Sequence, residues 1–327
     1  MLTTINHTPF DTRMLVLQNR DGYDTAVAVT KATFSLDGNT PSVSGTQQPI
    51  VFSDRYRGRP GKSSLLHASE TTMPKPFTDI VMNGHAYGRG RSEILVSLTV
   101  GRYEKTVKVS GVRYWKGMLS MTSMTGPEPF ARIPLDYEHA FGGEDEHASD
   151  PSRKETWPEN PVGMGFIMNG GKNQTKGIKI APIENPSKRI KDPWSRYSPE
   201  GFGYMAPHWM PRSGFAGTFN DRWLRERMPF LPEDFNPRFY NAAHPDLITR
   251  EYLAGNEPVA IINATPDGAL KFRLPGLRIH TVFHVQGTPE PAPSHLDTLI
   301  LEPDERRLMM VYRASMGCDK KMYHVES

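Results

Sequence analysis

Short runs of apolar and β-branched residues, separated by turn residues, occupy both ends of the chain. Near the start, one run covers residues 13–19 and a longer one covers 25–36. Between them, Asn19, Asp21 and Gly22 are residue types that favour a tight turn. The pattern therefore predicts a β-hairpin at this end of the protein.

The same signals predict further strands. Apolar positions alternate along residues 94–100, Gly101 interrupts the run, and valines resume it at 107–112, which indicates a second strand pair. Strand signals return in the last third of the chain at 259–263, 270–274, 279–285, 298–301 and 308–312. Turn residues lie between these runs, and the sequence has neither a repeat of fixed period nor a βαβ alternation.

The middle of the chain has a different character, because twelve prolines recur among aromatics and glycines over residues 127–217. Proline removes backbone donors and restricts the residue before it, so neither strand nor helix periodicity continues there. Disordered segments are poor in aromatic residues, and we therefore expect ordered but irregular structure. One short helix is predicted at 219–228, because Thr218 can cap it, Asp221 follows three residues later, and Pro229 ends the run.

These elements predict a mainly β protein, an antiparallel sandwich or barrel-like architecture. One or two short helices and a Pro/Gly-rich irregular central segment complete it. We interpret residues 1–327 as a single domain. Its possible internal division is a β-rich part at 1–126, a Pro- and aromatic-rich part at 127–245, and a second β-rich part at 246–327.

Composition narrows the function classes. With 37% hydrophobic and 23% charged residues over 327 positions, the chain can bury a sizeable core. Its net charge of +3 is too small to indicate a nucleic acid or a membrane surface as partner. The single cysteine, Cys318, excludes internal disulfides and any zinc site that needs two thiolates. No secretory signal and no apolar run of membrane-spanning length is visible, so we expect a cytoplasmic protein.

Motifs for chemistry are weak. Gly61-Lys62-Ser63 is not a phosphate-binding loop, because Tyr56 stands where that loop needs a glycine. Acidic residues and histidines gather in one glycine-containing stretch, where they could offer ligands to a cation: Glu138, His139, Glu144, Asp145, Glu146, His147 and Asp150. Their spacing matches no calcium loop, and a solvated acidic loop is the favoured interpretation. The sequence therefore predicts no metal, no cofactor and no catalytic residue.

An enzymatic alternative stays open at this point. An all-β chain with many carboxylates and with Trp157, Trp194, Trp209 and Trp223 also suits a carbohydrate-active or other hydrolase. Sugars stack on aromatic rings, and glycosidases need two carboxylates. No spacing in the sequence pairs two acids at catalytic distance, however, and tryptophans more often serve as core or interface anchors.

Several segments together resemble one known family. They read DIVMNGHAY at 79–87, VKVSGVRYW at 107–115, YEHAFGG at 137–143 and NPVGMGF at 160–166. A longer signature follows, with Trp209, Arg212, Gly217, Thr218, Trp223, Arg227, Pro229, Leu231, Pro232, Asp234, Phe235, Phe239, Asn241 and Ala242. In this order the segments resemble the family called domain of unknown function 2169, over most of the chain. Asn220 and Leu247 depart from the pattern, where the family leads us to expect aspartate and glutamine.

The resemblance implies a non-enzymatic role in bacterial type VI secretion. Members of that family are chaperones or adaptors that hold a cognate toxin effector, usually through its N-terminal PAAR-like region. They help to load the toxin onto the valine-glycine-repeat (VgrG) spike protein in the cytoplasm. The expected partners are therefore the toxin effector, the VgrG spike and its PAAR-like tip, with no nucleic acid and no membrane.

The residues expected to bind the partner are Trp209, Arg212, Trp223 and Arg227. Tryptophan and arginine are the residue types most enriched among binding hot spots. Phe219 and Trp223 lie four residues apart and so fall on one face of the predicted helix. We expect whichever of Trp209 and Trp223 is exposed to pack against the toxin, and the other to belong to the core.

Overall fold

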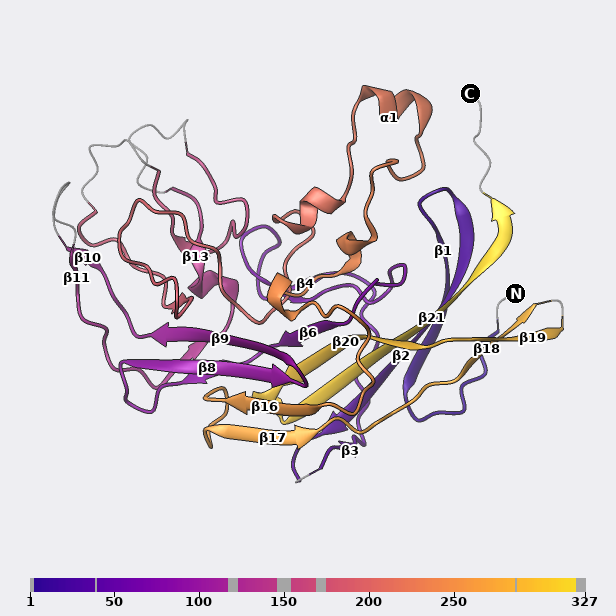
Figure 1. The fold of residues 1–327 in the computed structure, drawn as a ribbon, viewed down its shortest axis with the longest axis horizontal. Helices are drawn as coiled ribbons and strands as arrows, with labels where there is room; N and C mark the ends of the chain where they lie inside the picture. Colours follow the sequence, from indigo (N-terminus) through magenta and orange to yellow (C-terminus); the bar gives the residue numbers. More distant parts are fainter. Residues whose placement is uncertain are drawn as a thin grey trace.

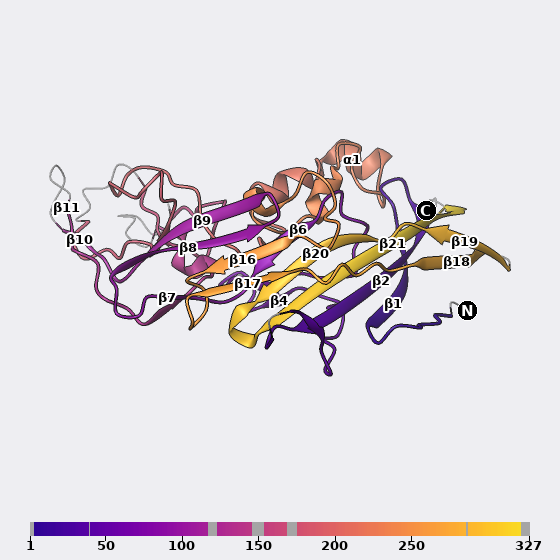
Figure 2. The same cartoon turned by 60° about the horizontal axis from the view of Figure 1, so that its bottom comes forward.

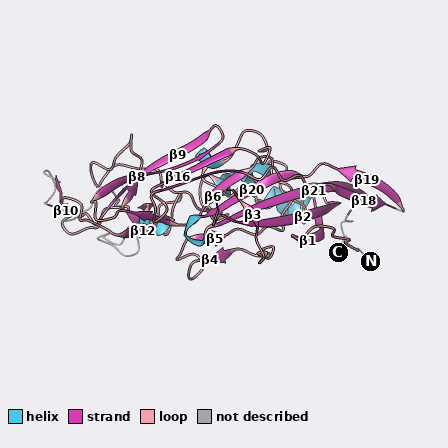
Figure 3. Ribbon diagram, turned by 90° about the horizontal axis from the view of Figure 1, so that it is seen from below, coloured by secondary structure: helices cyan, strands magenta, loops and turns pink. Residues whose placement is uncertain are grey.

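The computed structural model describes residues 3–38, 40–116, 123–145, 154–168, 175–285 and 287–321. Strands dominate it, with 38% strand and 8% helix, and its sheets are open and mostly antiparallel (Figures 1 and 3). The predicted mainly β fold is confirmed, and the arrangement is consistent with a sandwich. Within the described part of the chain no sheet closes into a barrel, which decides between the two predicted architectures.

The first large sheet contains the predicted hairpin. Its strands lie in the order β1 (Asp11–Gln18), β2 (Tyr23–Ser35), β21 (Arg307–Lys321), β20 (His295–Glu302) and β6 (Asp79–Met82), and β3 (Ser42–Val43) pairs with β2. Strand β2 pairs with β21 along its whole length and with β1 over residues 24–31, and most of its side chains are buried. Only β6 runs parallel to its neighbour, β20.

The second large sheet is antiparallel and contains the second predicted strand pair. Its order is β15 (Ile183–Glu184), β9 (Tyr103–Ser110), β8 (Glu93–Val100), β16 (Pro258–Ile262) and β17 (Ala269–Arg273). The burial pattern alternates along β8, as the sequence alternation predicts. Side chains from both large sheets join one continuous hydrophobic core, which includes Val27, Val96, Val259 and Leu299.

Smaller elements complete the structure (Figure 2). The hairpin of β18 (Thr281–Val285) and β19 (Thr288–Ala292) packs through Phe283 against β2 and β21. The remaining strands are β4 (Arg55–Tyr56), β5 (Leu65–His67), β7 (His85–Tyr87), β10 (Trp115–Lys116), β11 (Ser123–Met124), β12 (Arg132–Pro134), β13 (Phe141–Gly142) and β14 (Met164–Gly165). The short 3₁₀ turns are η1 (Tyr137–His139), η3 (Arg212–Phe215), η4 (Pro237–Tyr240), η5 (Pro245–Leu247) and η6 (Pro303–Glu305).

The proline-rich centre is ordered and irregular where it is described, as predicted. A second hydrophobic core lies here, in which Phe141 packs edge-on against Trp157, Phe166 and Tyr197. In this part of the chain, packing between aromatic side chains stabilises the structure as strand pairing does in the two large sheets. The division of the chain at residues 126 and 245 stays a prediction, and side chains on both sides of residue 245 contribute to the main core, for example Trp209 and Leu299.

Candidate functional site

A protruding segment, residues 217–235, stands away from both large sheets, and we call it the α1 arm (Figures 1 and 2). It contains the helix α1 (Asp221–Glu226). Its two ends are tied together by Asp234, whose carboxylate accepts hydrogen bonds from the backbone N–H of Thr218 at 2.9 Å and from its hydroxyl at 2.7 Å. These bonds lower the pKa of Asp234.

Helix α1 begins later than the sequence predicts. Asn220 is its N-cap, and its side-chain oxygen accepts from the backbone N–H of Trp223 at 2.9 Å. Thr218, the predicted cap, is instead engaged by Asp234 and lies outside the helix. Asparagine and aspartate cap helices equally well, so the departure from the family pattern at Asn220 keeps the helix start intact.

The α1 arm is braced on the turn between β1 and β2. The guanidinium of Arg227 donates to Asp21 at 2.5 Å and to the carbonyl of Arg20 at 3.1 Å. The hydrogen bond from Arg227 lowers the pKa of Asp21. Gly22, with φ of +83°, lies so close to the Phe230 ring that a Cβ there would be 2.1 Å from a ring carbon. The predicted partner-binding residue Arg227 therefore acts in this structure as a brace.

The α1 arm exposes three large apolar side chains among charged ones. Phe219 and Leu224 each expose 54% of their surface and Met228 exposes 45%. Trp223 is half-buried: its indole N–H donates to the carbonyl of Phe230 at 2.8 Å, and its ring lies edge-on to Phe219 at 4.8 Å. The rings of Phe219 and Trp223 are in contact, but Phe219 precedes the N-cap Asn220 and so lies outside the helix on whose face it was predicted. Large apolar side chains that are exposed on a segment held firmly against the rest of the fold are typical of a protein-binding surface.

Leu224 and Met228 were not singled out by the sequence, although a signal was available. Leu224 directly follows Trp223, so it points about 100° away from it around the helix, and Met228 lies beyond the end of α1. Adjacent apolar residues on a short helix cannot both face the same neighbour, so one of them is expected to be exposed.

Two of the four residues expected to bind the partner lie in the interior. Trp209 is only 1% exposed and packs edge-on against Tyr137, with ring centroids 5.4 Å apart. Arg212 is 9% exposed and donates to the carbonyls of Phe239 and Met205, each at 2.8 Å. Of the two tryptophans, Trp223 is therefore the one that a partner can reach.

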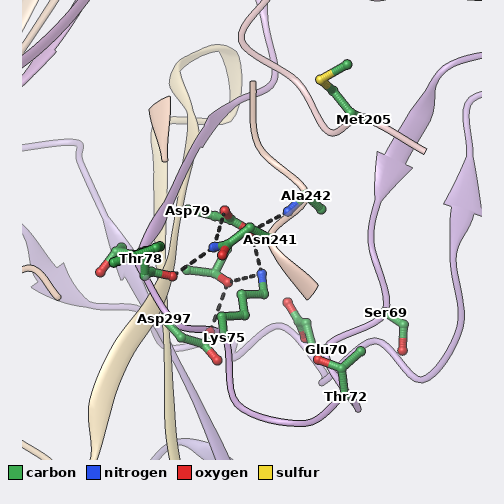
Figure 4. A network of polar contacts seen from close by, with 12 residues as sticks. Ser69, Glu70, Thr72, Lys75, Thr78, Asp79, Met205, Asn241, Ala242 and Asp297 are labelled. Atoms are coloured by element: carbon green, nitrogen blue, oxygen red, sulfur yellow. Dashed lines mark hydrogen bonds and ion pairs between the residues drawn. The ribbon is translucent and has the colours of Figure 1, made fainter. Parts of the chain in front are cut away.

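Other residues of the long signature hold the centre of the chain onto the first sheet (Figure 4). Asp79, fully buried on β6, accepts from the side chain of Asn241 at 2.9 Å and from the backbone N–H of Ala242 at 2.8 Å. Its other contact is the ammonium of Lys75 at 2.7 Å, which also donates to Thr298. The motif here is structural, because Asp79 and Asn241 each bond to a buried partner.

Two glycines of the motifs lie where the backbone of another segment comes too close to leave room for a side chain. A Cβ on Gly111 would lie 1.8 Å from the carbonyl oxygen of Glu128, and one on Gly142, where φ is +149°, would lie 2.2 Å from that of Asn160. No side chain fits at either position. Leu247, the second departure from the family pattern, is fully buried in the main core.

One buried cluster of charged groups was missed by the sequence. The ammonium of Lys105 on β9 lies 2.5 Å from Glu200, 2.9 Å from Asp246 and 3.4 Å from Nε2 of His244. The last three residues come close enough together to hold a metal ion. Lys105 already places a positive charge among them, so the arrangement is that of an ion-pair network, buried except at Asp246, whose side chain is 60% exposed. No sequence signal joins positions so far apart in the chain.

The acidic and histidine-rich stretch does not gather its ligands in the described part. Glu138 accepts from the backbone and hydroxyl of Ser64, and His139 pairs with Asp136 at 2.5 Å. Glu144 pairs with Lys62 and Lys154, and Asp145 accepts from the backbone N–H of Met168. Glu146, His147 and Asp150 lie outside the described residues. The bonds to Ser64 occupy both carboxylate oxygens of Glu138.

The Lys105 cluster predicts a pH dependence of stability. Burial, and then the charge of Lys105, lower the pKa of His244 to about 4 from 6.5. The imidazole is held neutral, because Nδ1 accepts from the backbone N–H of Asp246 while Nε2 faces the carbonyl of Pro199. Between pH 6.5 and 4 the unfolded chain binds more protons than the folded one, so stability falls as pH falls through this range. The loss amounts to about 3 kcal/mol at most.

Chemical denaturation at pH 7.5 and at pH 4.5 measures this effect, with His244→Gln as the comparison. Glutamine keeps a donor and an acceptor but cannot be protonated. We expect the variant to lose less stability than the wild type between the two pH values. His67, whose pKa burial also lowers to about 4, is present in both proteins and cancels in the difference. Equal losses in the two proteins would contradict the prediction.

Comparison with known proteins places the chain in a family. A family model described as an uncharacterized protein conserved in bacteria (DUF2169) matches residues 21–313. The chain belongs to this family. No curated protein and no solved structure matches it. The family match extends from the hairpin turn that braces the α1 arm to the last long strand, and so includes the arm, the Asp79 network and the Lys105 cluster.

A search for membrane-spanning helices gave a negative result for the described residues. None of their helices combines the length and the apolar character that crossing a bilayer requires.

Proposed function

We propose that this protein is a non-enzymatic adaptor of type VI secretion. It binds a cognate toxin effector, through the toxin's N-terminal PAAR-like region, and helps to load it onto the VgrG spike in the cytoplasm. The family resemblance supports this role, and membership of the bacterial family is consistent with it. The observation that carries the proposal is the α1 arm, which exposes Phe219, Leu224 and Met228 and is held against the β1–β2 turn by Arg227.

The α1 arm has the features that a reversible protein interface needs. Its apolar side chains supply anchors, and the exposed ion pair of Arg222 with Glu226 at 2.9 Å supplies part of a polar rim. The hydrogen bonds of Asp234 to Thr218 and of Arg227 to Asp21 hold the α1 arm in place before a partner binds. Less conformational entropy is therefore lost on association. A loading factor must also release its cargo, and a small apolar surface of this kind gives moderate affinity.

The hydrolase alternative is not favoured by any particular contact. Glu200 and Asp246 offer carboxylate oxygens close together, but both contact the ammonium of Lys105. A proton-donating acid needs a raised pKa, whereas the pKa of Asp246 is lowered: its burial raises it, and His244 and Lys105 outweigh that effect. Release of reducing sugar from polysaccharide by the purified chain would favour the alternative.

The adaptor proposal is tested by co-expressing the chain with the products of its neighbouring genes. A toxin gene and a spike gene beside this one are expected, and the tagged chain is expected to capture the toxin. The double variant Leu224→Ser/Met228→Ser should capture far less, because it removes two exposed anchors without touching the brace. Trp223→Ala should weaken binding by about 2 kcal/mol or more if Trp223 is a hot spot.

Leu95→Ser is the matched control, because Leu95 lies on β8 and exposes 53% of its surface, nearly the same as Leu224. It should capture the toxin as the wild type does. If the wild type captures no neighbouring gene product, the adaptor role is refuted. If the wild type and the arm variants capture the toxin equally, the adaptor role survives but the α1 arm is not the binding surface.

A further inference from the structure

A pocket of about 420 Å³ lies at the base of the α1 arm. Its lining residues come from η3, just before the arm, from η4, just after it, and from the segment that follows η5. Phe77, Phe215 and Ile248 give it apolar walls. Its size suits one large side chain with some of the neighbouring backbone, at the lower end of the range for ligand pockets.

The charged residues that line this pocket all have the same sign. They are Arg212, Arg238 and Arg250, and no aspartate or glutamate lines it. Among the described residues no carboxylate forms an ion pair with any of the three arginines. Arginine stays charged at any physiological pH, so the pocket carries an uncompensated positive charge.

Arg212 is the most informative of the three. Its Nε and Nη1 each donate to a backbone carbonyl, and no described residue accepts a hydrogen bond from Nη2. Burial lowers the pKa of Arg212, and Asp79 and Asp54 oppose that shift from a distance. Those two carboxylates are engaged elsewhere, Asp79 by Lys75 and Asp54 by the backbone of Ser69. Two carbonyls and the Phe239 ring, 5.4 Å from the guanidinium carbon, partly compensate this charge, and an anion supplied from outside would compensate it further.

We propose that this pocket binds a segment of a protein partner in which a carboxylate stands next to a large apolar side chain. The apolar side chain lies between Phe77, Phe215 and Ile248, and the carboxylate meets the arginines. Charge complementarity selects the acidic group. A protein segment suits the site because the pocket is lined by η3 and η4, the two turns that flank the α1 arm in the chain. The inference rests on the proposed adaptor function only in taking the occupant to be protein.

The test uses N-acetylphenylalanine, its amide and decanoate as probes. Saturation-transfer NMR on the full chain measures their dissociation constants. N-acetylphenylalanine should bind at least tenfold more tightly than the amide, which lacks the negative charge, and its binding should weaken as salt is raised. The double variant Arg238→Glu/Arg250→Glu should lose at least tenfold. Both arginines are exposed, so the fold is preserved, whereas Arg212 is left intact because it pins two carbonyls.

Lys271→Glu is the control, because it reverses the charge of an exposed lysine on β17 that does not line the pocket. This variant should bind N-acetylphenylalanine as the wild type does. Equal affinity for acid and amide, no binding of either, or no effect of Arg238→Glu/Arg250→Glu would overturn the proposal. Tighter binding of decanoate than of N-acetylphenylalanine would overturn a protein occupant in favour of a lipid. None of these outcomes depends on toxin capture, so the pocket and the adaptor role can fail separately.

Discussion

The Asp79→Asn variant is expected to unfold with a free energy about 3–5 kcal/mol lower than that of the wild type. Asp79 is fully buried and joins three groups: the ammonium of Lys75, the amide of Asn241 and the backbone N–H of Ala242. An asparagine has nearly the same shape, but it removes the negative charge and leaves Lys75 buried without its counter-ion. Its amide also turns a donor toward groups that themselves donate.

Urea denaturation followed by tryptophan fluorescence measures this loss. Asp267→Asn is the matched control, because its carboxylate contacts Arg306 on the surface and is 67% exposed. Exposed ion pairs contribute about 0–1 kcal/mol, so this variant should unfold almost as the wild type does. The structural role of Asp79 would be refuted if the two variants had equal stability. Asp79→Asn should also loosen the centre of the chain, since Asn241 and Ala242 connect the centre to Asp79 on β6.

Truncation of Trp209 is the second change with a large expected effect. Trp209→Ala should lower the free energy of unfolding by about 3–5 kcal/mol, the usual range for removing a large aromatic from a core. The ring is 1% exposed and packs edge-on against Tyr137, which is buried as well. The loss of the ring leaves a cavity that neighbours of this rigidity cannot fill.

Trp223→Ala provides the comparison for Trp209→Ala, because it makes the same chemical change at a half-buried position of the α1 arm. It should cost less stability, since the ring loses fewer contacts, even though its hydrogen bond to Phe230 disappears. Thermal and chemical denaturation of both variants give the two values. A smaller loss for Trp209→Ala than for Trp223→Ala would contradict the burial seen here.

The sequence identified the residues of the candidate site only in part. Resemblance to the family drew attention to Trp209, Arg212, Trp223 and Arg227 together, because residue type alone does not distinguish an anchor from a brace. In the structure the first two lie in the interior and Arg227 grips the β1–β2 turn, which leaves Trp223 beside the exposed Phe219. Motif residues here mostly hold the fold, and the exposed Leu224 and Met228 lie outside the motif.

Local pattern predicted most of the longer strands of this protein, but it missed β6 and β19 and the part of β21 beyond residue 312. Alternation of side chains along β8 and the turn residues before β2 act within a few positions, so they can be read from the sequence alone. Even there, the start of α1 shifted from Thr218 to Asn220, because Asp234, sixteen residues away, engages Thr218.

Only the tertiary structure decided which side chains face solvent and which distant charges meet. The Lys105 cluster joins β9 to residues 200, 244 and 246, and the pocket at the base of the α1 arm gathers Phe77, Arg212 and Arg250. Contacts of this kind depend on how the sheets and the irregular centre pack, since burial and electrostatic pairing act through space. A sequence fixes the local backbone preferences, whereas long-range packing sets the surface on which a partner can bind.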